Sequence, residues 1–182
     1  MAQPLGIYIH IPFCKSKCDY CDFYSLAGRE DAMDRYQKAL LSHIKTLAPF
    51  LKGRPVDTIY FGGGTPSYYG EKRLREVLSS LLRHFSVNRS AEITLECNPD
   101  SVDLRSMAKL RRAGFNRVSL GMQSADSQQL HCIHRIHTPQ QVSDAVQDIR
   151  RARFDNFSLD LIYGLPGQTM VDWERTLAAA IY

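Results

Sequence analysis

The sequence lacks any long apolar segment. No stretch approaches the roughly 18 apolar residues that a membrane-spanning helix requires, so none is predicted. The first residues, Met-Ala-Gln-Pro-Leu-Gly, have neither the basic region nor the apolar region of a secretory signal. We therefore expect a cytoplasmic protein.

Evenly distributed cysteines and a strong charge of either sign are also missing. The chain has five cysteines, an odd number, and three of them are clustered, which argues against a secreted disulfide framework. The net charge of +4 is modest, and several arginines fall at predicted helix ends, where cations complement the helix dipole. The charge therefore predicts no nucleic-acid partner.

What is present is enough apolar material for a core. With 182 residues and 44% hydrophobic composition, the chain is predicted to form one globular domain over residues 1–182. Short β-rich runs alternate with longer segments of helical period, which predicts an α/β fold with a parallel sheet. The expected strands are 5–11, 56–61, 91–97, 116–122 and 156–162. The expected helices are 31–48, 70–85, 102–113, 139–151 and 169–181.

These five βα units are too few to close a barrel of about eight strands. The prediction is therefore a partial (β/α) TIM-like barrel, which is either an open arc or a fragment of something longer. Within each strand one face is apolar and the other carries polar residues. A closed barrel normally fills its interior with apolar side chains, so the polar faces indicate a ligand cavity. The alternative, a sheet with one solvated face, is weakened by the helical connections.

Three cysteines after the first strand carry the most specific signal. Cys14, Cys18 and Cys21 form a C-x3-C-x2-C triplet. A [4Fe–4S] cluster normally takes four thiolates, so three local cysteines leave one iron free for another ligand. A cluster that only holds the loop in place is a further interpretation. It is the weakest one, because a closed structural metal site would take all its ligands from the protein.

Further polar groups follow the other strands. The loop Gly62-Gly-Gly-Thr-Pro66 offers bare backbone groups to a ligand, although a sharp turn explains it equally well when it is taken alone. Glu96 and Asp160 lie at strand ends, where carboxylates suit an amine or ribose hydroxyls; the alternative is a buried carboxylate bonded to neighbouring backbone or to an arginine. Gln123 and Arg135 are placed to supply an amide and a cation to the same cavity.

Together these residues resemble the radical S-adenosylmethionine superfamily, whose cysteine motif includes an aromatic residue at the position of Tyr20. More narrowly, five motifs resemble the oxygen-independent coproporphyrinogen III oxidase group: Tyr8-Ile-His-Ile-Pro-Phe-Cys, Gly-Gly-Gly-Thr-Pro, Glu96-x-Asn-Pro, Gly121-Met-Gln-Ser and Asp160-Leu-Ile-Tyr-Gly-Leu-Pro. The resemblance runs from Tyr8 through Pro166. It implies the radical S-adenosylmethionine type of partial barrel.

The resemblance also implies cofactors and their contacts. In that group the free iron is chelated by the amino and carboxylate groups of S-adenosylmethionine, and an electron from the reduced cluster breaks the C–S bond to give a 5′-deoxyadenosyl radical. Tyr20 would pack near the cofactor. The residues implied to contact it are Tyr8, Gly63, Gly64, Thr65, Glu96, Gln123, Arg135 and Asp160.

Phe23 distinguishes two branches of this group. The oxidases carry another cysteine at its position, and its absence resembles the haem chaperone branch, HemW, which binds haem and passes it to an acceptor protein. The resemblance implies haem or porphyrin, an acceptor protein, an electron donor such as flavodoxin or ferredoxin, and peripheral membrane contact as partners. The alternative function is the oxidase itself, in which propionate side chains are decarboxylated to vinyl groups.

Several other residues invite a metal or haem interpretation. His131, His134 and His137 are more readily surface or packed histidines before a helix, and the family usually has glycine at the position of His134. Cys97 and Cys132 are both expected to be small buried apolar residues. His10 suits a hydrogen bond that orients the cysteine loop and equally suits proton transfer, and Trp173 suits packing rather than cofactor binding. Relatives are about twice as long, and their C-terminal His-Asn-x-x-Tyr-Trp motif does not occur here.

Overall fold

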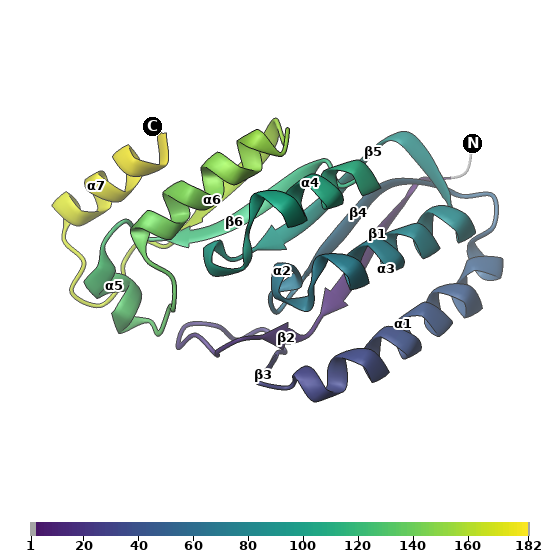
Figure 1. The fold of residues 1–182 in the computed structure, drawn as a ribbon, viewed down its shortest axis with the longest axis horizontal. Coiled ribbons are helices and arrows are strands. Elements are labelled where there is room, and N and C mark those ends of the chain that lie inside the picture. Colours follow the sequence, from purple (N-terminus) through teal and green to yellow (C-terminus); the bar gives the residue numbers. More distant parts are fainter. Residues whose placement is uncertain (1–2, 182) are drawn as a thin grey trace.

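The sheet of this protein is parallel and open. The computed structural model describes residues 3–181. Five strands lie in the order β1-β4-β5-β6-β7, and every neighbouring pair is parallel (Figure 1). The strands are β1 (Leu5–Ile11), β4 (Pro55–Gly63), β5 (Ser86–Cys97), β6 (Arg117–Gln123) and β7 (Asn156–Leu161). The predicted parallel α/β arrangement is confirmed.

Helices connect successive strands and cover one face of the sheet, as Figure 1 shows. The long ones are α1 (Met33–Leu47), α3 (Glu71–His84), α4 (Leu104–Ala113), α6 (Pro139–Arg151) and α7 (Met170–Ile181). None of the helices described for residues 3–181 combines the length and apolar character needed to cross a membrane. The parallel order follows from these connections, because a helical crossover returns the chain to the same end of the sheet.

The sequence patterns did not predict the shorter elements. They are β2 (Phe13–Cys14), β3 (Leu26–Ala27), α2 (Pro66–Tyr69), α5 (Ser127–Cys132), and the 3-10 turns η1 (Glu30–Ala32), η2 (Ala48–Leu51) and η3 (Pro99–Ser101). Segments of two to six residues contain too few side chains to display a period. The β2 and β3 strands pair with each other and bracket the cysteine loop.

Element ends follow local chemistry where the sequence supplies it. The Thr138 hydroxyl accepts from the Gln141 backbone N–H, and the Gln141 side chain accepts from the Thr138 N–H, forming the predicted capping box of α6. Gly114 ends α4 with φ of 119°. By contrast, β5 begins at Ser86 rather than near residue 91, because its first residues pair with Pro55 and Val56 across a register shift.

The apolar faces of the strands form the core beneath the helices. The buried apolar strand residues of this core include Ile9, Ile11, Val56, Ile59, Phe61, Ile93, Leu95, Cys97, Val118, Leu120 and Met122. From α3, Leu74, Val77 and Leu78 pack against this face. In the edge strand β7, Phe157 and Leu159 are only half-buried. The opposite, polar face is left for the site at the carboxyl ends of the strands.

Candidate functional site

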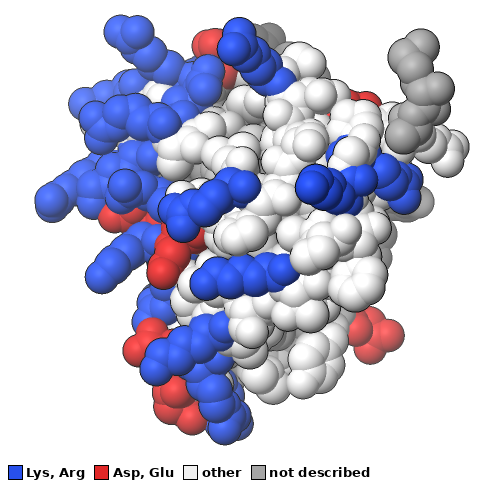
Figure 2. Space-filling view, turned by 90° about the vertical axis from the view of Figure 1, so that its right-hand side faces the viewer, with Lys and Arg blue, Asp and Glu red and all other residues white. Residues whose placement is uncertain are grey.

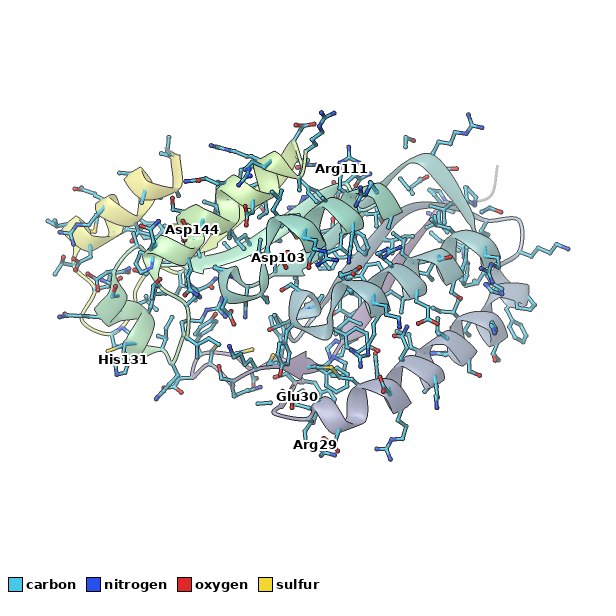
Figure 3. The ribbon with its side chains drawn as sticks, in the orientation of Figure 1. Arg29, Glu30, Asp103, Arg111, His131 and Asp144 are labelled. Carbon is cyan, nitrogen blue, oxygen red and sulfur yellow. The ribbon has the colours of Figure 1, made fainter. Side chains whose placement is uncertain are left out.

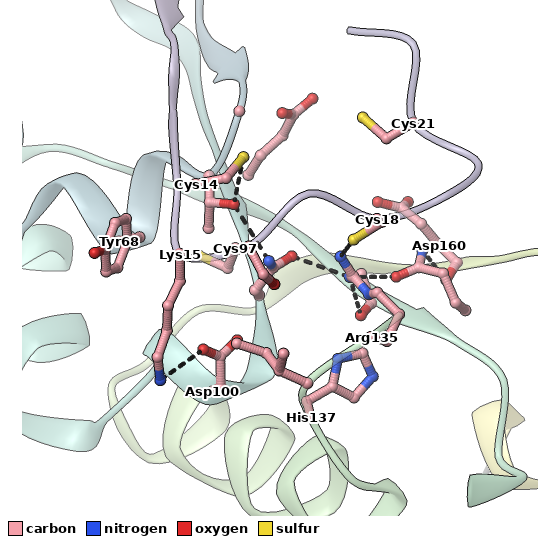
Figure 4. A pocket seen from close by; sticks show the side chains of 18 of the residues that line it. Cys14, Lys15, Cys18, Cys21, Tyr68, Cys97, Asp100, Arg135, His137 and Asp160 are labelled. Atoms are coloured by element: carbon pink, nitrogen blue, oxygen red, sulfur yellow. Dashed lines mark hydrogen bonds and ion pairs between the residues drawn. The ribbon is translucent and has the colours of Figure 1, made fainter. Parts of the chain in front are cut away.

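A cavity of about 280 Å³ lies at the carboxyl ends of the central strands (Figure 4). Loops that follow β1, β4, β5, β6 and β7 all contribute to it, which is where parallel α/β folds place their ligands. All the predicted site residues line it except Tyr8 and Gly63. Those that do are Cys14, Cys18, Tyr20, Cys21, Gly64, Thr65, Glu96, Gln123, Arg135 and Asp160.

The three cysteines share this cavity as free thiols. Thr65 Oγ1 donates to Cys14 Sγ at 3.5 Å, and Arg135 Nη1 donates to Cys18 Sγ at 3.5 Å. Among residues 3–181, no three His, Cys, Asp or Glu side chains lie close enough to hold a single metal ion. The three thiols therefore line a common cavity but are too far apart to bind one metal ion together.

Arg135 is the centre of the polar wall. Its Nη2 donates to the Gly121 carbonyl and to Asn98 Oδ1, each at 3.0 Å, and to Gln123 Oε1. Its Nε is buried and has no partner within the described residues. An unmatched buried donor costs free energy, so an acceptor bonded to this Nε would be stabilising.

Asn98 links the wall to the cysteines, and sequence reasoning did not select it as a site residue. Asn98 Nδ2 donates to Thr65 Oγ1 at 3.2 Å, so a chain of hydrogen bonds runs from Arg135 through Asn98 and Thr65 to Cys14 (Figure 4). The signal was available, since Asn98 lies in the Glu-Cys-Asn-Pro motif directly after a strand.

Glu96 is held by its neighbours. Its carboxylate accepts from Tyr60 Oη at 2.7 Å and from the Gly63 N–H at 3.1 Å. Burial raises the pKa of Glu96 above its ordinary value, while these two hydrogen bonds act in the opposite direction. The carboxylate is thus bonded to backbone, as the alternative interpretation had it, and also lines the cavity.

The ends of β6 and β7 place two further predicted residues. Asp160 accepts from Ser119 Oγ, with distances of 3.0 and 2.8 Å to its two carboxylate oxygens. Gln123 has φ of 58° at a register shift between β6 and β7, and its Nε2 donates to the Asp160 carbonyl at 3.2 Å. The bulge turns the Gln123 side chain toward Arg135.

Tyr8 and Gly63 lie beside the cavity and support it. The Tyr8 hydroxyl donates to His10 Nδ1 at 3.0 Å, and His10 Nε2 donates to the Tyr24 carbonyl at 2.9 Å. A carbonyl can only accept, so Nε2 carries the proton and Nδ1 accepts. The hydrogen bond expected between His10 and the loop that carries the cysteines is present. Gly63 contributes its N–H to Glu96.

The cysteine loop also carries exposed aromatic residues. Tyr20 is 43% exposed and Phe23 is 69% exposed, and both line the cavity. Partial burial raises the pKa of Tyr20 to about 12, so its hydroxyl is protonated at neutral pH. The loop thus contributes neutral aromatic side chains to the lining of the cavity.

The three histidines near α5 and Trp173 differ in burial and in contacts. His131 is exposed, and His134, also exposed, pairs with Asp19 at 2.6 Å with its backbone at φ of 52°, where glycine would be unstrained. His137 is buried, as one of the packed alternatives, and its Nε2 donates to the Met122 carbonyl at 3.2 Å. Trp173 packs against Tyr163.

The two remaining cysteines differ. Cys97 is buried, and burial raises the pKa of its thiol to about 12, as expected for a small apolar residue. The same expectation for Cys132 is wrong, because its side chain is exposed at the end of α5. Its short helix is too brief to bury both faces.

The chain is similar in sequence to several known proteins. The chain is 38% identical to the haem chaperone HemW of Mycobacterium tuberculosis H37Rv over 182 residues, covering 98% of this chain and 47% of that protein. It is 36% identical to the oxygen-independent coproporphyrinogen III oxidase of Synechocystis over 176 residues, covering 96% of this chain and 38% of the oxidase. The chain therefore spans about half the length, or less, of these relatives.

A solved structure has the same fold. The coproporphyrinogen III oxidase HemN of Escherichia coli, described as a radical SAM enzyme, matches with a TM-score of 0.91 and 33% identity. The match covers 97% of this chain and 41% of that one. The sequence model of the Radical SAM superfamily matches residues 8–180. Membership implies S-adenosylmethionine and a [4Fe–4S] cluster, and the chain belongs to the radical SAM superfamily.

Proposed function

We propose that this chain binds one [4Fe–4S] cluster through Cys14, Cys18 and Cys21 and binds S-adenosylmethionine in the adjoining cavity. One observation carries the proposal: the three thiols and the polar groups of four strand ends line the same cavity. Three thiolates would leave one iron of such a cluster without a protein ligand and so open to a chelating cofactor.

The donor set fits both groups. Thiolates are the usual ligands of iron–sulfur clusters, and hydrogen bonds to Cys14 and Cys18 are of the kind that tune them. A four-iron cluster spaces its thiolates more widely than one ion does, so the separated thiols do not conflict with it. The unpartnered Nε of Arg135 offers a charge-assisted hydrogen bond to a carboxylate.

The protein's own residues have distinct tasks in this proposal. Glu96 and Asp160 would accept from an amine or from ribose hydroxyls, and Arg135 would orient a carboxylate. Tyr8, Gly63 and Gly64 would hold these groups in place, with Thr65, Gln123 and Tyr20 completing the walls. When bound, the reduced cluster supplies the electron that breaks the C–S bond of S-adenosylmethionine.

For the protein as a whole, we propose the function of a cytoplasmic haem chaperone. The support is the 38% identity to proteins named HemW and the presence of Phe23, an exposed aromatic residue in the cavity lining, where the oxidases carry a further cysteine. Its partners would be haem, an acceptor protein, an electron donor such as flavodoxin or ferredoxin, and a membrane surface for peripheral contact.

The oxidase is the second candidate, favoured by the structural match to HemN and the 36% identity to the Synechocystis oxidase. An anaerobic assay of the reconstituted protein with coproporphyrinogen III separates the two. We expect stoichiometric haem binding without turnover. A clear yield of protoporphyrinogen would instead establish the oxidase.

The cofactor proposal has its own test. After anaerobic reconstitution, we expect about four irons per chain and an electron paramagnetic resonance signal of the reduced cluster that shifts when S-adenosylmethionine is added. Cys18→Ala should lose the cluster, whereas Cys132→Ala, which changes a thiol outside the cavity, should retain it. A signal unaffected by S-adenosylmethionine would reduce the cluster to a structural role.

A further inference from the structure

Arginines gather in a second hollow, away from the cofactor cavity. The hollow has a volume of about 430 Å³ and is lined by Ala108, Arg111, Arg112, Arg151, Ala152 and Arg153. It lies where α4 and α6 end, and Figure 3 labels Arg111 at this end of α4. In Figure 2, Lys and Arg concentrate on the helix-covered side of the molecule, at the left of the view.

The helix dipole explains only part of this cluster. Cations in the last turn of a helix are favourable, and each of these helices has two there. The hollow, however, is lined by four guanidinium groups and by no acidic residue. Arg151 pairs with Asp148 at 3.6 Å, while Arg111, Arg112 and Arg153 make no ion pair within residues 3–181.

Two similar helix ends allow a comparison within the chain. Helix α4 ends in Arg111-Arg112-Ala-Gly-Phe115, and α6 ends in Arg150-Arg151-Ala-Arg-Phe154. In both, the phenylalanine N–H bonds to the carbonyl five residues earlier, at Leu110 and Ile149 respectively, each at 3.2 Å. The left-handed position before the phenylalanine is Gly114 in α4 and Arg153 in α6.

Arg153 therefore occupies a position that favours glycine. Its φ is 65°, in the left-handed region, where a residue with a side chain is strained and glycine is not. The neighbouring helix end shows that glycine fits the same turn. An arginine in that position brings one further guanidinium to the hollow at the expense of local strain.

Arg111 is already fixed in place. Its Nε donates to the Arg153 carbonyl at 2.8 Å, and its guanidinium lies 5.9 Å from the centre of the Phe154 ring. A fixed guanidinium loses little side-chain entropy when it binds an anion. Arg111, Arg112 and Arg153 together offer guanidinium N–H donors that make no ion pair within residues 3–181.

We propose that this hollow binds a phosphate group. Guanidinium groups match phosphate oxygens with paired hydrogen bonds, and an anion relieves the repulsion among the arginines. The phosphate would belong either to a free phosphate ester or to a phospholipid headgroup, which share this chemistry. The site shares no lining residue with the cofactor cavity, so it stands independently of the proposed cofactors; only the headgroup alternative overlaps the membrane contact proposed above.

The experiment uses the whole chain and inorganic pyrophosphate as the probe, measured by isothermal titration calorimetry at low salt. Arg112→Gln combined with Arg153→Gly removes two guanidiniums and places in α6 the glycine that α4 has. We expect this pair to weaken pyrophosphate binding at least tenfold. The matched control, Arg83→Gln with Arg89→Gln, removes the same charge from exposed residues outside the hollow and should leave the affinity unchanged.

Two further measurements complete the test. Thermal unfolding should show that both double variants remain folded. Flotation with phosphatidylglycerol vesicles identifies the source: flotation lost in the hollow pair and displaced by pyrophosphate indicates a headgroup, whereas pyrophosphate binding without flotation indicates a free ester. Either result supports the site. No saturable binding to either probe, or equal weakening by both pairs of substitutions, would overturn it.

Discussion

At the scale of single residues, Arg135 explains why the cavity needs residues that are distant in sequence. It is bonded to Asn98 directly after β5, to Gly121 within β6 and to Cys18 of the N-terminal loop. Each of these bonds satisfies part of a half-buried guanidinium, and the buried Nε is the donor that has no partner among the described residues. A ligand carboxylate would complete an arrangement that the protein has already built.

His137 makes stability depend on pH. Burial, and secondarily the charge of Arg135, lower the pKa of His137 from 6.5 to about 4. The unfolded chain therefore takes up a proton between these values while the folded chain does not. This contribution is present above about pH 6.5 and is lost as the pH falls toward 4, by about 3 kcal/mol in all.

The matching experiment is urea unfolding at pH 7 and pH 5. In His137→Gln, which keeps an N–H donor for the Met122 carbonyl, we expect the loss of unfolding free energy between the two pH values to be smaller by about 2 kcal/mol. His131→Gln, at an exposed position, should behave as the wild type does. An identical pH dependence in His137→Gln and wild type would contradict the assignment.

At the scale of elements, the glycine loop after β4 is a support as well as a ligand surface. Gly64 donates to the Ile11 carbonyl at 2.8 Å, and a Cβ on it would lie 2.8 Å from the Phe13 carbonyl oxygen. The loop thus runs directly against β2, which leads into the cysteines. Close backbone approach explains this glycine at least as directly as contact with a cofactor does.

Gly64→Ala should therefore act on the cysteine loop. Because the backbone of β2 must move away, we expect a loss of about 2 kcal/mol in the free energy of unfolding and weaker cluster retention. Urea unfolding and iron content after reconstitution measure the two effects. An alanine variant with unchanged stability and iron content would show that β2 is free to shift.

Thr138→Ala tests the capping box at the start of α6. Removing the hydroxyl leaves the Gln141 N–H without its acceptor, so we expect a loss of about 1 kcal/mol in the free energy of unfolding. Thr138 lies outside the cavity lining, and the iron content should remain that of the wild type. Thr138→Ser, which keeps the hydroxyl, is the matched control, and equal losses in both variants would argue against the cap.

At the scale of the whole molecule, the strands of the sheet differ in how far they are buried from solvent. β6 is buried along nearly its whole length between β5 and β7, whereas β7 is half-buried and has one sheet neighbour among the described residues. Hydrogen exchange measured by mass spectrometry should be at least tenfold slower in residues 118–122 than in residues 157–161. Equal exchange would mean that β7 is covered in solution by another segment or chain.

Local patterns determined much of this arrangement. Alternation in Ile9, Ile59 and Leu95 predicted which strand face is buried, and Thr138 and Gly114 predicted helix ends, because these properties depend on neighbours in sequence. Short elements such as β2 and α5 were not predictable, since their pairing or packing comes from distant segments. Exposure of Cys132 was mispredicted for the same reason: side-chain chemistry does not specify which way a brief helix faces.

The sequence by itself determined the cysteine spacing, the parallel βα order and the polar strand ends, all of which are encoded within single segments. Only the tertiary structure decided that Asn98 connects Arg135 to Thr65 and Cys14, that Tyr8 and Gly63 do not line the cavity, and that four arginines from two helix ends line one hollow. These relations depend on distances across the fold, and a distance between segments arises only when the sheet brings them together.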